Sequence, residues 1–157
     1  SEPGEGTAFN LYFPLQNKTD SYSSGVEPVT DIKGNGENIL IVDDNPEILS
    51  MLSSMLTDLN YSFKIANNGK EGLELYLQKP AFYDCVLSDQ TMPTMTGIEM
   101  SKKILEIDKN AKIILCTGFA QNITKDDAEN AGIRLFLDKP ILQTELSHAL
   151  YKVLTQE

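Results

Sequence analysis

The sequence predicts an α/β domain in which a parallel sheet is covered by helices on both faces. From Asn38 onward, short continuous apolar runs alternate with segments of helical periodicity, and this pattern occurs five times. Continuous apolar strands are typical of a parallel sheet that is buried on both faces. The chain of 157 residues is long enough for one such domain and a modest tail.

Each expected strand is a short apolar run that leads into a polar residue. The first expected strand is Ile39–Val42, and it ends in two aspartates. The second runs from Tyr61 to Ala66 and is followed by an Asn-Asn-Gly turn. The other three are expected at Cys85–Ser88, Ile113–Cys116 and Ile133–Leu137.

The expected helices lie between these strands and after the last one. One helical stripe is formed by Ile48, Leu49, Leu52, Met55, Leu56 and Leu59. A second helix is expected over residues 71–78, because Pro80 disfavours its continuation. Further helices are expected over residues 97–107, 123–131 and 143–154. The apolar pattern of the helix over residues 123–131 is weak.

The composition argues against several classes of function, including nucleic-acid binding and membrane spanning. The net charge of −10, from 13 basic and 23 acidic residues, argues against a nucleic-acid surface. No apolar run approaches the roughly 20 residues that a membrane span needs, and the start does not resemble a signal peptide. We therefore expect a cytoplasmic chain without direct membrane contact, while a longer parent protein could be membrane-anchored. Cys85 and Cys116 are expected to be reduced core residues, and the single His148 excludes a multi-histidine metal site.

Carboxylate, hydroxyl and amine side chains stand at the ends of four of the five expected strands. They are Asp43 and Asp44, Asp89, Thr117, and Lys139. In doubly wound sheets ligands bind at the carboxyl ends of the strands, so we expect these side chains to converge. Three carboxylates would repel one another unless a cation neutralised them, and oxygen ligands alone suit Mg²⁺. With a hydroxyl and an amine beside them, they suit phosphoryl transfer to a carboxylate, which gives an acyl phosphate.

Each of these residues also has an ordinary explanation when it is taken alone. An Asp-Asp pair after a strand is usually a turn or a helix cap, and Lys-Pro usually starts a helix. Phe136 alone would usually be a core residue. The coincidence at the ends of four strands favours the functional interpretation.

The segment from Asn38 to Glu157 resembles a response-regulator receiver domain of two-component signalling. The motifs that carry the resemblance are Ile41-Val42-Asp43-Asp44-Asn45, Leu87 to Pro93 with Gly97, Cys116-Thr117-Gly118 and Asp138-Lys139-Pro140. The resemblance implies a doubly wound, flavodoxin-like (βα)5 fold with strand order 2-1-3-4-5, preceded by an N-terminal tail.

The resemblance also implies the roles of the acidic residues. Asp89 would accept the phosphoryl group from a phosphohistidine of a histidine kinase or a histidine phosphotransfer domain. Asp44, Asp89 and the backbone carbonyl of Thr91 would ligate Mg²⁺ directly, and Asp43 would act mainly through metal-bound water.

Thr117 and Phe136 would form the switch pair, and Lys139 would neutralise a phosphoryl oxygen. Such a domain catalyses only its own phosphorylation and dephosphorylation, so it is an enzyme in a loose sense. The resemblance leaves a homodimer open. Neither Thr91 nor Phe119 carries a carboxamide or carboxylate to orient an attacking water, so we expect a long-lived phosphoryl group.

The residues before the domain form two parts. Residues 15–37 are polar and lack periodicity, which predicts a linker. Residues 1–14 contain Gly4 and Gly6 in a Gly-Glu-Gly-Thr sequence, which is either a phosphate-cradling loop or a flexible turn. This part resembles the last glycine box and final strand of a histidine-kinase ATP-binding domain, which implies the C-terminal receiver of a hybrid sensor kinase. The other kinase boxes are absent, so ATP binding is not expected.

Two other functions remain as alternatives. An aspartate-nucleophile phosphatase would carry Asp-x-Asp at the nucleophile, but Gln90-Thr91 follows Asp89. A degenerate receiver that only binds proteins would not need the complete acidic set.

Overall fold

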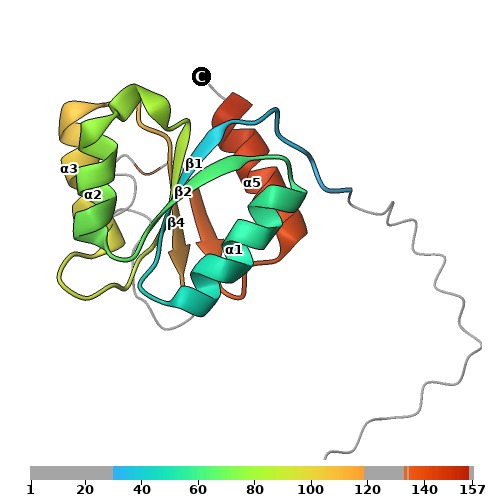
Figure 1. The fold of residues 1–157 in the computed structure, drawn as a ribbon, viewed down its shortest axis with the longest axis horizontal. Helices are drawn as coiled ribbons and strands as arrows, with labels where there is room; N and C mark the ends of the chain where they lie inside the picture. Colours follow the sequence, from blue (N-terminus) through green and yellow to red (C-terminus); the bar gives the residue numbers. More distant parts are fainter. Residues whose placement is uncertain (1–29, 119–132, 134, 156–157) are drawn as a thin grey trace, which may run out of the picture.

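The computed structural model describes residues 30–118, 133 and 135–155, and these residues form a three-layer α/β domain (Figure 1). Five parallel strands form one sheet in the order β2-β1-β3-β4-β5, as predicted. The strands are β1 (Asn38–Val42), β2 (Ser62–Ala66), β3 (Cys85–Asp89), β4 (Ile113–Thr117) and β5 (Leu135–Asp138). The expected helix over residues 123–131 lies outside the described residues.

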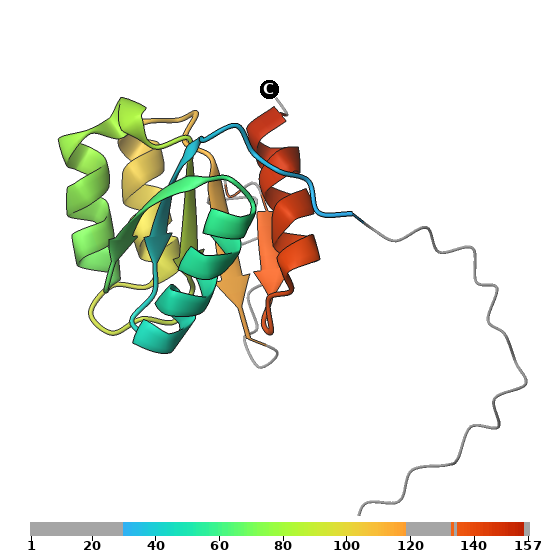
Figure 2. The same ribbon diagram turned by 45° about the vertical axis from the view of Figure 1, so that its right-hand side comes forward.

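In the described part of the chain, each face of the sheet is covered by two helices. The helices are α1 (Pro46–Asp58), α2 (Gly69–Gln78), α3 (Gly97–Ile107) and α5 (Gln143–Thr155), with a short 3₁₀ turn, η1 (Pro80–Phe82). Figure 2 shows α1 and α5 on one side of the sheet and α2 and α3 on the other. No described helix combines the length and apolar character that crossing a lipid bilayer requires.

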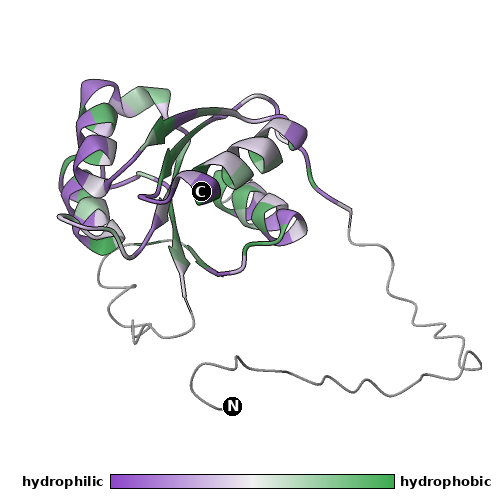
Figure 3. Ribbon diagram, turned by 60° about the horizontal axis from the view of Figure 1, so that its bottom comes forward, coloured by the Kyte–Doolittle hydropathy of each residue, from purple (hydrophilic) through white to green (hydrophobic). Residues whose placement is uncertain are grey.

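The three central strands are buried because alternate residues face two separate cores. Ile39, Leu87 and Ile114 pack under α1 and α5. Leu40 and Leu115 pack under α2 and α3. Figure 3 shows this arrangement as hydrophobic central strands and helices that carry their hydrophilic residues away from the sheet. The two-sided burial explains why the strands are continuous apolar runs.

Two helices begin earlier in the sequence than their apolar stripes predict, because the residue before each helix caps its first turn. The Asn45 side chain accepts hydrogen bonds from the backbone of Glu47 and Ile48, so α1 begins at Pro46. The Asn68 side chain accepts from the backbone of Glu71, so α2 begins at Gly69. An asparagine that precedes a helix offers its side-chain oxygen to the unpaired N–H groups of the first turn.

Both cysteines lie in the core, as their apolar surroundings predict. Cys85 and Cys116 are each 1% exposed, and burial raises the pKa of both thiols to about 12. At pH 8 only about one thiol in ten thousand would then be ionised, and the thiolate is the reactive form. We expect a thiol reagent to leave both residues unmodified in the native protein and to label both in guanidinium chloride. Stoichiometric labelling of the native protein would contradict this expectation.

Candidate functional site

The carboxyl ends of four strands bring the predicted site residues to one edge of the sheet. Asp89 is the last residue of β3 and pairs in register with Cys116. Asp43 follows β1, whose last residue Val42 pairs with Ser88 on β3. Parallel register therefore places Asp43 beside Asp89, as the sequence predicts.

Three carboxylates form a cluster at this edge. Oxygen atoms of Asp43, Asp44 and Asp89 all lie within 4.8 Å of one another. Asp43 and Asp89 are buried, at 2% and 8% exposure, whereas Asp44 is exposed. An all-oxygen donor set with one side open to water is the environment that Mg²⁺ prefers, because this ion retains several of its waters. The residues present therefore fit a magnesium ion.

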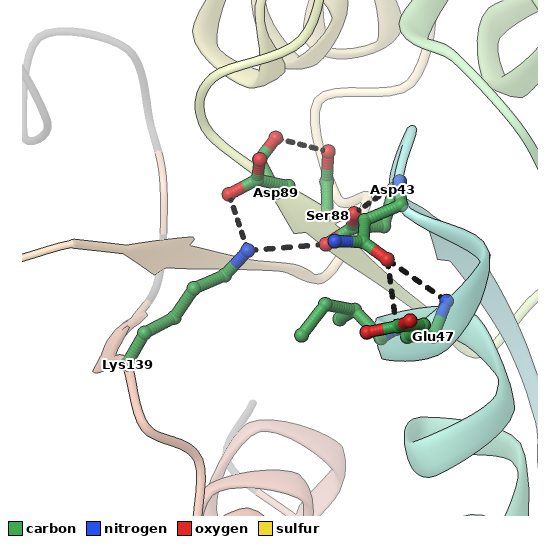
Figure 4. Close-up of polar contacts among 7 residues, drawn as sticks. Asp43, Glu47, Ser88, Asp89 and Lys139 are labelled. Atoms are coloured by element: carbon green, nitrogen blue, oxygen red, sulfur yellow. Dashed lines mark hydrogen bonds and ion pairs between the residues drawn. The ribbon is translucent and has the colours of Figure 1, made fainter. Parts of the chain in front are cut away.

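Lys139 reaches into the cluster from the segment between β5 and α5 (Figure 4). Its Nζ atom lies 2.9 Å from Oδ1 of Asp89 and 3.1 Å from Oδ2 of Asp43. Desolvation alone would lower the pKa of Lys139, but the hydrogen bonds to the two carboxylates outweigh it and raise the pKa. Three carboxylates still face one ammonium group, so the site holds excess negative charge. Such an excess favours a divalent cation.

The backbone around Asp89 is held from two sides. The Ser88 hydroxyl donates to the carbonyl oxygen of Asp89 at 2.8 Å, as Figure 4 shows. Helix α3 begins directly against the same carbonyl, and a Cβ atom at Gly97 would overlap it. Only glycine permits this approach, so α3 and β3 are fixed relative to one another.

Gln90 closes the loop that joins Asp89 to α3. Its backbone N–H donates to Cys116, at 3.0 Å, and its carbonyl oxygen accepts from Gly97, at 3.0 Å. Its side-chain oxygen accepts from the backbone of Ile98 at 3.1 Å. Thr91 lies in this exposed loop, two residues beyond Asp89. The apolar pattern of the sequence does not reveal Ser88, Gln90 or Gly97 as supports, because each acts through a hydrogen bond to a backbone group or a close approach to one.

Asp43 has its own support on the α1 side of the site. Its Oδ1 atom accepts from the backbone N–H of Asn45 at 2.8 Å. Asn45 also caps α1, so one residue orients both the helix and the carboxylate. The Asn-Pro sequence at 45–46 is a helix-start signal that could have pointed to this role.

Thr117 and Phe136 lie on neighbouring strands and on the same face of the sheet. Leu115 pairs with Phe136 and Thr117 pairs with Asp138, so the two predicted switch residues are diagonal neighbours. Phe136 packs against the core cluster under α2 and α3. The Thr117 hydroxyl donates to Oδ1 of Asp138 at 3.3 Å. Phe119 lies outside the described residues.

A family model described as the response regulator receiver domain matches residues 39–151. The chain belongs to this family. The matched segment contains the whole acidic cluster and Lys139, and it is a receiver domain of two-component signalling. Proteins of the family bind Mg²⁺ at an acidic site and interact with histidine kinases and phosphotransfer partners.

The chain is similar both to a protein of nearly the same length as the receiver domain and to one part of a much longer sensor protein. The chemotaxis protein CheY of Thermotoga maritima is 40% identical over 120 residues, which are 75% of this chain and 98% of that protein. The aerobic respiration control sensor protein ArcB of Escherichia coli is 29% identical over 154 residues, which are 97% of this chain but only 19% of ArcB.

Solved structures of receivers share the fold. The receiver domain of a sensor histidine kinase from Pseudomonas aeruginosa, with a magnesium ion coordinated in the active-site cleft, has a TM-score of 0.70 at 25% identity. That likeness covers 77% of this chain and 99% of the other. A CheX–CheY complex from Borrelia burgdorferi with beryllofluoride and Mg²⁺ has a TM-score of 0.72 at 28% identity, covering 76% and 90%.

Proposed function

We propose that Asp89 is the residue that accepts the phosphoryl group in this receiver domain. The observation that carries the proposal is the position of its carboxylate, 2.9 Å from Lys139 and inside the cluster with Asp43 and Asp44. Transfer of a phosphoryl group from acetyl phosphate to the chain in the presence of Mg²⁺, detected by intact mass, tests the proposal.

The transfer is a displacement at phosphorus. A carboxylate oxygen of Asp89 forms the new bond while the phosphorus–nitrogen bond of the donor phosphohistidine breaks. The electron pair of that bond returns to the ring nitrogen, and the imidazole leaves neutral when its other nitrogen carries a proton. The product is an acyl phosphate on Asp89.

The remaining site residues stabilise the charge of the phosphoryl group. Asp44, Asp89 and the carbonyl of Thr91 would hold Mg²⁺, with Asp43 acting through a bound water. When bound, the ion neutralises the repulsion between the anionic acceptor and the anionic phosphoryl group. Lys139 would pair with one phosphoryl oxygen.

Phosphorylation would then shift a two-state equilibrium. The Thr117 hydroxyl would exchange its bond to Asp138 for one to the phosphoryl group, and Phe136 would repack beside it. The new charge-assisted contacts favour the second state. The surface of β5, α5 and the segment between β4 and β5 would thereby change its partner preference.

A small apolar pocket beside the site could receive a side chain of the protein that delivers the phosphoryl group. Its volume is about 90 Å³, and it is lined by Ile48, Met51, Lys139, Pro140 and Ile141. The pocket joins α1 to the segment that carries Lys139, so an apolar side chain seated there would lie next to the acceptor. We therefore propose that a histidine kinase or phosphotransfer domain docks on this surface.

A charge introduced into the pocket should affect phosphoryl transfer from a donor protein but not from a small-molecule donor. We expect Met51→Glu to slow transfer from a phosphohistidine protein roughly ten-fold or more, because central contacts contribute about 2 kcal/mol to binding. Transfer from acetyl phosphate, which needs no docking, should keep its rate. Ser50→Glu, on the exposed side of α1, is the matched control. Equal loss with both donors would show damage to the site and would contradict a docking role.

The lifetime of the acyl phosphate follows from what lies near the acceptor. Thr91 has no carboxamide or carboxylate to orient a water molecule, and Gln90 uses its side chain to bind Ile98. We expect the isolated domain to retain its phosphoryl group for minutes or longer, as followed by loss of label from the purified protein. A half-life of seconds would contradict this expectation. The same absence of an acid two residues after Asp89 argues against a phosphatase.

We further propose that the chain derives from a hybrid histidine kinase and acts in the cytoplasm, where the kinase finds ATP. The similarity to ArcB supports this because its 154 aligned residues reach into the part of the chain before residue 38. Residues 1–14 would then be the end of an ATP-binding domain, and residues 15–37 would link it to the receiver. The sequence of the parent gene tests this proposal directly.

A further inference from the structure

Residues 31–37, called the strap below, precede the segment that matches the family and yet are bound to the domain. The family match begins at residue 39, and the sequence predicts a linker over the strap. Figure 2 shows this part of the chain passing along α5 before it enters β1. It makes hydrogen bonds to the α1–β2 turn at one end and to α5 at the other.

The first set of contacts joins the strap to the turn between α1 and β2. The backbone N–H of Gly34 donates to the carbonyl oxygen of Leu59, at 2.9 Å, and that of Gly36 donates to Asn60, at 3.0 Å. The Asn60 side chain donates back to the carbonyl oxygen of Gly34 at 2.8 Å. Gly34 packs so closely on the Tyr61 ring that an added Cβ would overlap it. Because Tyr61 is only 6% exposed, its ring has little room to move away.

The second set of contacts joins the strap to the first turns of α5. The Gln143 side chain donates to Oδ2 of Asp31 at 2.7 Å. The backbone N–H of Ile32 donates to the hydroxyl oxygen of Ser147 at 3.3 Å, and Ser147 is fully buried. The strap therefore joins the α1–β2 turn to the first turns of α5.

The N-terminal end of the strap lies toward the same end of the domain as Asp89. Strand β1 starts at the pole opposite Asp89, because the site lies at the carboxyl ends of the strands. Asp31, however, contacts Gln143, the first residue of α5 and only four residues after Lys139. Between them Ile141 is anchored in the core at 4% exposure. A shift of Lys139 would therefore reach the strap through a short, packed segment.

We propose that the strap is a regulatory element of the receiver, docked while Lys139 bridges Asp43 and Asp89 and loosened when Asp89 is phosphorylated. Phosphorylation draws Lys139 toward a phosphoryl oxygen, and the first turn of α5 moves with it. The change passes along the strap to whatever precedes Thr30. The inference rests on the proposed function of Asp89, and it adds a route by which that site communicates with the preceding chain.

Linkage requires the coupling to act in both directions. Saturating Mg²⁺ and beryllofluoride should speed amide hydrogen exchange of Ile32 and Gly34 by about five-fold or more, the lower end of allosteric couplings. Reciprocally, Gly34→Ala should undock the strap and lower the beryllofluoride concentration for half-saturation by a similar factor. Thr30→Ala, just outside the strap, should leave that concentration unchanged.

Asp31→Ala provides a second variant that cuts the link to Gln143 without adding a Cβ against Tyr61, and it should act in the same direction. The Thr117 amide reports separately on the site itself. If beryllofluoride shifts Thr117 while Ile32 and Gly34 are unaffected, or if neither variant tightens binding, the coupling is wrong and the proposed function stands. If Thr117 does not shift, the proposed function fails and the coupling fails with it.

Discussion

Asp89→Asn is expected to abolish phosphoryl transfer to the chain. The substitution keeps the size of the side chain but replaces the carboxylate nucleophile with a neutral amide, which cannot form a stable acyl phosphate. The fold should survive, because Lys139 keeps its 3.1 Å contact with Asp43 and the Ser88 bond goes to the backbone of residue 89. Intact mass after incubation with acetyl phosphate and Mg²⁺ measures the transfer, and circular dichroism checks the fold.

Asp84→Asn is the matched control for this experiment. Asp84 lies just before β3, at the opposite end of the strand from Asp89, and accepts a hydrogen bond from the backbone of Asn38 at 2.8 Å. An asparagine can accept the same bond, so the control protein should be phosphorylated at the wild-type rate. A phosphoryl group that persists on the Asp89→Asn protein would assign the acceptor to another residue.

Removal of Mg²⁺ is expected to have the second large effect. Chelation should stop phosphorylation, and Asp44→Asn should weaken Mg²⁺ binding because it removes one of the three clustered carboxylates. Asp44→Asn leaves both ion pairs of Lys139 in place. The site therefore loses ligand charge while its internal bridge remains.

The same ion should stabilise the domain by mass action. Wild-type protein should gain about 2.7 kcal/mol in its free energy of unfolding when free Mg²⁺ is one hundred times Kd. Thermal unfolding in MgCl₂, compared with NaCl of equal ionic strength, measures this gain. Glu47→Gln, an exposed acid in the first turn of α1, should retain the wild-type response. A gain that survives in Asp44→Asn would place the ion elsewhere.

The strand ends could be predicted from sequence because two-sided burial leaves a clear pattern. Each continuous apolar run stops where the sheet stops, so the polar residue that follows must lie at the edge. Asp43 and Asp89 were located by this rule, and their clustering is what the structure shows. Helix starts were predicted less well, because Asn45 and Asn68 extend α1 and α2 beyond their apolar stripes.

The strap could not be predicted in the same way. Its contacts are mainly backbone hydrogen bonds, and Gly34 and Gly36 present no side chain whose periodicity could be recognised. A glycine-rich polar stretch is also typical of a flexible linker. The fit of Gly34 against Tyr61 and the hydrogen bonds to the α1–β2 turn and to α5 distinguish a docked segment from a free one, and both appear only in three dimensions.

The burial of both cysteines makes this domain convenient for spectroscopy. Because Cys85 and Cys116 are inaccessible, cysteines introduced at exposed positions would take up a spin label or a fluorophore selectively. A probe at Thr30 would sit beside the strap, and a partner probe at exposed Tyr151 would sit on α5. The distance between the two could then be followed in real time while Asp89 is phosphorylated, in a protein whose native thiols need not be removed.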